Sequence, residues 1–452
     1  MESIALKIKG FFSNGHERTL KAKKNVAVSV LLRGVNIAVG FILIPMTIDY
    51  VNPVQYGIWL TLSTIIAWFN FFDIGLGNGL KNKLAEANAL GDYKNAKMYV
   101  STTYAILLII ALILFSVFSI FYKYINWGAI LNSNVLSNES FSLLGLLLAG
   151  IFCVQFVVQL INIVLTSNHQ PSKVSLISSI SQIICCLTIF VMKKVTAGSL
   201  IKLLIVFGGI PVLVQLVASI WLYLTDYKVF APQIKSVNLS HAKSLLNTGG
   251  VFFIIQIGAL ILFQTDNIVI TQLLGPKQVT VFNVVFKLFS TISMVFTIII
   301  TPLWSAFTDA YTKNDMDWIK HTLKKMKKYW CILTGLDFVL LILSPLIYKV
   351  WLHNSIEIPF FISLAMALQI SVNCWQIIHV YFLNGTGKVR LQLYMVILSS
   401  IINLPLAIIL GKHYGIVGVT FANVIIYLVL GIVFSIQSNK IINGTATKLW
   451  AK

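Results

Sequence analysis

The stretch FSLLGLLLAGIFCVQFVVQLINIVL, residues 141–165, decides the class of this protein. It carries no charged side chain, and as a helix it is long enough to cross a hydrocarbon core of about 30 Å. Comparable runs recur along the 452-residue chain, of which 58% is hydrophobic and only 11% charged. The alternating pattern of membrane-barrel strands is absent. The sequence therefore predicts an all-α integral membrane protein.

The apolar runs predict about twelve transmembrane helices in two bundles of six. The basic amino terminus, residues 1–25, is followed by an apolar run without a cleavage site, so we expect this first helix to be retained. The predicted parts are a cytoplasmic amino terminus (1–25), an N-terminal bundle (26–224), a cytoplasmic linker (225–246), a C-terminal bundle (247–437) and a cytoplasmic tail (438–452). The predicted spans are 26–48, 56–77, 99–122, 141–165, 174–192, 200–224, 247–272, 279–303, 329–351, 358–383, 391–411 and 416–437.

The distribution of positive charge predicts the orientation of these helices. With the amino terminus inside, 25 Lys and Arg side chains fall on the cytoplasmic side and 7 on the outer side. Positive loops resist translocation, so both termini are expected in the cytoplasm. The net charge of +20 is then explained without a nucleic-acid partner.

Two pairs of short segments suggest that the bundles are related by duplication. IDYVNPVQYGIW after the first span aligns with TQLLGPKQVTVF after the seventh, so that Pro53 matches Pro276 at an offset of 223. Lys173 before the fifth span aligns with Lys388 before the eleventh, at an offset of 215. A repeat of six helices preserves orientation, so the sequence predicts a pseudo-twofold axis along the membrane normal and a central cavity between the bundles.

Four ionisable side chains within predicted spans are candidates for function: Arg33, Asp73, Asp266 and Lys287. Each costs on the order of 3 kcal/mol to insert, so each needs a partner, a wet cavity or a nearby interface. Measured from the turn of its hairpin, Arg33 matches Asp73 in depth, and Asp266 matches Lys287. They could be structural ion pairs. Alternatively, the two cations line the cavity and bind an anionic substrate.

Uncharged polar and aromatic side chains within the spans could contact sugars, although interhelical hydrogen bonds explain most such residues. No motif points to catalysis, a metal or a cofactor. The five cysteines lie in apolar runs without metal-ligand spacing. The glycine-rich run from Asp73 to Ala87 lacks the GK[ST] of a phosphate-binding loop. The candidate sugar contacts are Trp59, Asn70, Gln155, Gln159, Gln256 and Trp375.

A basic segment precedes the ninth predicted span. Ile319, Leu323, Met326 and Trp330 recur at helical spacing, opposite a series of lysines. This pattern predicts an amphipathic helix that lies on an anionic lipid surface.

The stretch FILIPMTIDYVNPVQYGIWLTLSTIIAWFNFFDIGLGNGLKNKLAEA, residues 41–87, resembles the oligosaccharide flippases of the multidrug, oligosaccharidyl-lipid and polysaccharide exporter superfamily. A second stretch, residues 263–288, resembles the start of that family's second half. The resemblance implies two six-helix lobes around a central cavity. It also implies movement of a polyprenyl-diphosphate-linked oligosaccharide, such as an O-antigen unit, from the cytoplasmic to the outer leaflet of the bacterial inner membrane.

By this resemblance, Arg33 and Lys287 would contact the substrate diphosphate, and Asp73 and Asp266 would serve as charge partners or coupling-ion sites. Transport would use an ion gradient and alternating access. The partners would be the lipid-linked oligosaccharide, membrane lipids, and a polysaccharide polymerase with its export machinery.

Four alternatives stay open at this point. A cation-coupled multidrug antiporter of the same superfamily would need carboxylates deep in the cavity, whereas the charges here are balanced. The related peptidoglycan-precursor flippase has fourteen helices. A membrane glycosyltransferase or polysaccharide polymerase would carry a larger extramembrane loop with acidic or His residues. A structural scaffold would not need charges within its spans.

Overall fold

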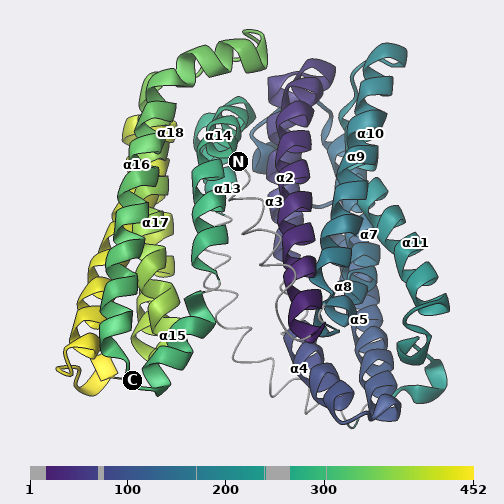
Figure 1. Cartoon of the computed structure of the whole chain (residues 1–452). Coiled ribbons are helices and arrows are strands. Elements are labelled where there is room, and N and C mark those ends of the chain that lie inside the picture. The colour runs from purple at the N-terminus through teal and green to yellow at the C-terminus, as the bar shows by residue number, and fades with distance from the viewer. Residues whose placement is uncertain are drawn as a thin grey trace, which may run out of the picture. The chain divides into compact units, whose positions relative to one another are not determined.

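The structure, a computed structural model, describes residues 17–69, 76–168, 170–238, 240, 265–301 and 303–451 (Figure 1). These residues form helices, and none of them lies in a strand, as the all-α prediction requires. Nine helices within these ranges are long and apolar enough to cross a membrane. One of them, α18, contains two predicted spans, because a kink at Gly415 (φ 62°) separates its arms. The seventh predicted span lies mostly outside the described residues.

The helices agree with the predicted spans in position. Gly415 lies between the spans 391–411 and 416–437, and the five-residue π-turn η2 interrupts the span 200–224. The principal helices are α2 (Glu17–Val51), α3 (Pro53–Phe69), α4 (Leu76–Ala89), α5 (Tyr93–Phe121), α6 (Trp127–Leu131), α7 (Asn138–Val158), α8 (Leu160–Ser167), α9 (Pro171–Val195), α10 (Leu200–Leu204), η2 (Ile205–Gly209), α11 (Ile210–Leu224), α13 (Asp266–Leu274), α14 (Pro276–Ile300), α15 (Leu303–Thr312), α16 (Met316–Leu352), α17 (Phe360–Thr386) and α18 (Arg390–Ile442).

The chain divides into two compact units, and their boundaries differ from those of the predicted bundles. Unit 1 comprises residues 1–51, 65–127 and 136–254, and unit 2 comprises residues 52–64, 128–135 and 255–452. Two short segments of the predicted N-terminal bundle therefore belong to unit 2. In unit 2, α16, α17 and α18 pack side by side (Figure 1).

Small side chains let the start of α3 pack closely within unit 2. A Cβ atom on Gly57 would lie 1.7 Å from the backbone oxygen of Pro276, so only glycine allows this approach. The Thr280 hydroxyl donates to the Pro53 oxygen at 2.6 Å. The hydroxyls of Thr61 and Thr271 lie 2.6 Å apart. Small and hydroxylated residues give membrane helices their closest contacts, which explains why 52–64 joins this unit.

The aligned segments of the proposed repeat have matching local structure. Pro53 begins α3 and Pro276 begins α14, and the residue before each proline, Asn52 or Gly275, has a φ of 86°. The same offset of 223 relates two helix caps that the alignment did not include. Asp92 accepts a hydrogen bond from the Asn95 N–H and caps α5, and Asp315 caps α16 in the same way. One further pair of residues at this offset, Asp92 and Asp315, thus has the same local structure.

The basic segment before the ninth span forms a helix, but the prediction that it lies on lipid is wrong. It is the first part of α16. Its apolar side chains are buried within the protein: Ile319 is 0% exposed, Leu323 6% and Met326 4%. The ring of Trp318 packs edge-on against Phe307 of α15. The apolar stripe therefore fixes this segment to its own chain, and the lysines occupy the outer face.

Candidate functional site

A carboxylate lies buried in unit 2 at the start of α13. Asp266 is 8% exposed, and its Oδ2 accepts a hydrogen bond of 2.7 Å from Asn423 Nδ2 on the second arm of α18. The Asn423 Oδ1 in turn accepts from Asn403 Nδ2 on the first arm at 2.9 Å. One oxygen of Asp266 and the Oδ1 of Asn403 have no hydrogen-bond partner among the described residues. This group, the Asp266 cluster, therefore offers unsatisfied oxygen atoms inside a membrane-spanning unit.

A second chain of hydrogen bonds begins at the next residue. Asn267 donates to the Thr64 hydroxyl at 2.8 Å and accepts from Asn283 Nδ2 of α14 at 2.8 Å. Lys287 is half-buried and lies one helical turn beyond Asn283, on the same side of α14. The neighbouring helices α13 and α14 therefore place a carboxylate and a cation in one polar region of unit 2.

The predicted ion pairs have different outcomes. Among the described residues no ion pair joins Asp266 to Lys287, and the carboxylate instead accepts a hydrogen bond from the amide of Asn423. Asp73, the predicted partner of Arg33, lies outside the described residues. Arg33 itself is exposed on α2 in unit 1.

The candidate sugar contacts are partly used in packing. Gln155 of α7 donates to Gln215 of α11 at 2.6 Å, which is the interhelical hydrogen bond expected of most such residues. The ring of Trp375 packs against Gly431, where a Cβ atom would lie 2.4 Å from it. Gln159 is half-buried at the end of α7, and Trp59 is half-buried on α3. Asn70 and Gln256 lie outside the described residues.

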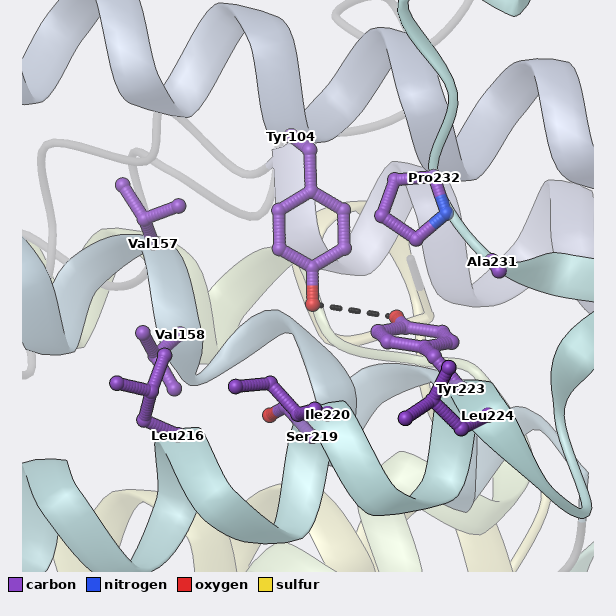
Figure 2. A pocket seen from close by; sticks show the side chains of 10 residues that line it. All are labelled: Tyr104, Val157, Val158, Leu216, Ser219, Ile220, Tyr223, Leu224, Ala231 and Pro232. Atoms are coloured by element: carbon purple, nitrogen blue, oxygen red, sulfur yellow. Dashed lines mark hydrogen bonds between the residues drawn. The ribbon is translucent and has the colours of Figure 1, made fainter.

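Unit 1 contains a hollow of about 410 Å³ between α5, α7 and α11 (Figure 2). The Tyr223 hydroxyl donates to that of Tyr104 across it at 3.1 Å. Its lining is otherwise almost entirely apolar and contains no charged residue: Tyr104, Val157, Val158, Leu216, Ser219, Ile220, Tyr223, Leu224, Ala231 and Pro232. The hollow suits hydrocarbon and offers no charge to a diphosphate.

Comparison with known proteins identifies the family. Residues 22–307, more than half of the chain, match the family described as polysaccharide biosynthesis protein. The chain belongs to this family. A protein of Yersinia pseudotuberculosis whose name proposes O-antigen export is 24% identical over 85% of this chain and 88% of its own. One of Salmonella typhi, whose name proposes O-antigen transport, is 23% identical over 88% and 91%.

Solved structures of transporters share the fold of this family member. The chain is similar to the inward-facing conformation of a multidrug resistance MATE family transporter of the MOP superfamily, with a TM-score of 0.69 and 14% identity. That similarity covers 94% of this chain and 98% of the other. The outward-facing structure of a MATE family transporter gives a TM-score of 0.61 at 15% identity, over 94% and 96%. The predicted polysaccharide family is confirmed, and the chain has the fold that the resemblance implied. The curated relatives are named for export and transport, in agreement with the prediction of a transporter in place of an enzyme.

Two members of the Asp266 cluster, Asn403 and Asn423, were not among the residues predicted from the sequence. Asn403 and Asn423 are equally far from residue 413, in the turn between the last two predicted spans. The depth comparison used for the charged residues would therefore have predicted that these two asparagines lie at the same level. Asp337, the one acidic residue in the predicted span 329–351, was not predicted either. Among the described residues no three His, Cys, Asp or Glu side chains gather as a metal site would require.

Proposed function

We propose that this protein flips a polyprenyl-diphosphate-linked oligosaccharide of the O-antigen type from the cytoplasmic to the outer leaflet of the bacterial inner membrane. The polysaccharide biosynthesis family and the O-antigen names of the relatives support this substrate class. Movement follows alternating access, and both termini are cytoplasmic. The proposal excludes an enzymatic reaction on the glycan.

The observation that carries the proposal is the polar region of unit 2, where Lys287 lies one turn from the Asn283–Asn267 chain. A cation within a membrane span is expensive and marks a substrate or ion pathway. An ammonium group is a strong hydrogen-bond donor to phosphate oxygens. We assign Lys287, with Arg33 of unit 1, to the diphosphate of the substrate.

The Asp266 cluster is proposed as the coupling site. Its carboxylate and amide oxygens, two of them without a partner among the described residues, suit a small monovalent cation. Binding that cation neutralises Asp266, and releasing it restores a charge that favours a different arrangement of the surrounding helices. An ion gradient can drive transport if the two states differ in cation affinity.

The proposal is tested in liposomes that hold a fluorescent polyprenyl-diphosphate oligosaccharide. The fraction of this lipid in the outer leaflet is followed with and without an ion gradient. We expect translocation by the native protein and its loss in Lys287→Ala and Arg33→Ala. Lys287→Arg retains a cation and should keep part of the rate.

Lys277→Ala is the matched control, because Lys277 lies on the same helix but is exposed at its start. Equal losses from Lys277→Ala and Lys287→Ala would contradict a specific role for Lys287. Efflux of a cationic dye, without movement of any lipid-linked sugar, would instead support the multidrug antiporter.

A further inference from the structure

A second carboxylate, remote in sequence from the Asp266 cluster, is fully buried in unit 2. Asp337 lies on α16 and is 0% exposed. It stands fifteen residues before Leu352, the last residue of the helix, which at 1.5 Å per residue places it about 22 Å from that end. Leu333 and Leu341, one turn to either side, are also buried. The carboxylate is therefore well inside the span.

The described contacts of Asp337 do not neutralise its charge. Its Oδ2 accepts a hydrogen bond of 2.9 Å from the Ser371 hydroxyl of α17. Its Oδ1 has no hydrogen-bond partner among the described residues. None of the ion pairs within those residues includes it. One hydroxyl is a weak replacement for the water that an ionised carboxylate loses on burial.

Polar groups from three mutually packed helices converge on this position. Ser371 and Cys374 lie one turn apart on α17, and Ser293 of α14 is within hydrogen-bonding reach of the Cys374 thiol. Cys374 is close enough to Asp337 to interact with it electrostatically. The indole N–H of Trp330, two turns earlier on α16, donates to the Ser371 backbone oxygen at 2.7 Å. This contact fixes α17 against α16, so that the Ser371 hydroxyl faces the Asp337 carboxylate.

The geometry points to Asp337 as an exchangeable proton-binding site, separate from the Asp266 cluster. A cation must compensate a carboxylate at this depth, and its surroundings decide which one. Two hydroxyls and a thiol provide few oxygen ligands for a sodium ion, whereas a proton requires only the unsatisfied Oδ1. Binding converts the carboxylate to a neutral carboxylic acid without any other covalent change.

The titratable groups around the site have separate partners. Cys374 faces Asp337 from α17, and the nearby Ser293 of α14 is uncharged. His379, farther along α17, is hydrogen-bonded to Ser438 of α18 and interacts with Lys327 of α16. On α15, Asp309 is exposed and paired with Lys313. Among the described contacts of Asp337 there is thus no basic side chain to which its proton would pass directly.

Infrared difference spectroscopy of the full-length protein in liposomes tests the site without a transport substrate. We expect a carboxylic-acid C=O band that shifts when H₂O is exchanged for D₂O and that disappears in Asp337→Asn. Asparagine keeps the shape and can still accept the Ser371 hydrogen bond. Ser371→Ala should retain the band but move its frequency, because that frequency depends on hydrogen bonding. Asp309→Asn, at an exposed carboxylate, should leave the band unchanged.

A band that survives unaltered in Asp337→Asn, or one that never exchanges in D₂O, would overturn the proposal. So would loss of the band on adding sodium at constant pH, since sodium would then be the bound cation. In the translocation assay, Asp337→Asn should lose the acceleration that a proton gradient gives. This last readout rests on the proposed function, but the infrared result does not, so failure of either can be recognised separately.

Discussion

The described interiors of the two units differ in their chemistry. In unit 1 the described interhelical contacts deep in the spans are neutral, such as Gln155 with Gln215. The ion pair that joins α9 to α2, Lys193 with Asp49, lies at the ends of both helices. Its hollows are lined almost wholly by apolar side chains. Unit 2 buries two carboxylates, Asp266 and Asp337, each with one unsatisfied oxygen among the described residues. Unit 2 is therefore the part that we expect to bind and release cations, while unit 1 provides apolar surface.

The largest expected effect is on ion coupling. Asp266→Asn should reduce the factor by which an ion gradient accelerates translocation. We expect a reduction of roughly 5- to 150-fold, which corresponds to a coupling free energy of about 1–3 kcal/mol. Gln155→Leu, which removes a neutral polar group from unit 1, should change the acceleration much less. The liposome assay with and without a gradient measures both. Equal effects would remove the proposed difference between the units.

Close packing gives the next contrast. Gly57→Ala places a Cβ against the Pro276 oxygen and should destabilise the protein by about 1–3 kcal/mol. Gly34→Ala on α2 of unit 1 meets nothing within 4 Å and should be neutral or slightly stabilising. Thermal unfolding in detergent provides the comparison. A stable Gly57→Ala protein would show that the start of α3 can move away from α14.

Removing one hydrogen-bonding amide in each unit separates a charged network from a neutral one. Asn423→Leu leaves Asp266 without its described donor and should cost about 1–3 kcal/mol. Gln215→Leu in unit 1 should cost about 0.6 kcal/mol, the average for an interhelical hydrogen bond. Unfolding midpoints of both variants, measured at one pH, test this order. The reverse order would indicate that Asp266 depends little on its amide partner.

The hydroxyl pair in the hollow of unit 1 should matter little. Tyr223→Phe removes its hydrogen bond to Tyr104 and keeps the apolar ring, so we expect a loss of about 0.6 kcal/mol and nearly native translocation. A large loss of translocation with intact folding would show that the hollow binds a polar part of the substrate.

The smallest effect concerns a helix cap outside the spans. The Asn95 N–H, followed by the Asn95 side chain, lowers the pKa of the Asp92 carboxyl. Its stabilisation is therefore present above the ordinary aspartate pKa of about 4 and is lost as the pH falls through the lower folded-state value. Asp92→Ala should be slightly less stable than the native protein at neutral pH and equally stable in acid. Melting curves across this range test the sign.

The sequence alone predicts the membrane class, the positions of most spans and the family. These follow from apolar run length and from a contiguous motif, both of which are local properties of the chain. It also located Asp266 and Lys287, because a charge within an apolar run is conspicuous. The repeat offset of 223 extends in the structure to the helix caps Asp92 and Asp315.

Which side chains meet depends on how the helices pack in three dimensions. Depth along a helix constrained Asp266 and Lys287 to the same level, but the direction of each side chain around its helix placed Asn423 at the carboxylate. An apolar stripe such as the one at Ile319 is expected of a helix that faces lipid and equally of one that faces protein. The packing of α16 buries this stripe within the protein. Segment 52–64 joined unit 2 because small side chains allowed close contact with residues more than 200 positions away. Such choices depend on neighbours distant in sequence, which no local pattern specifies.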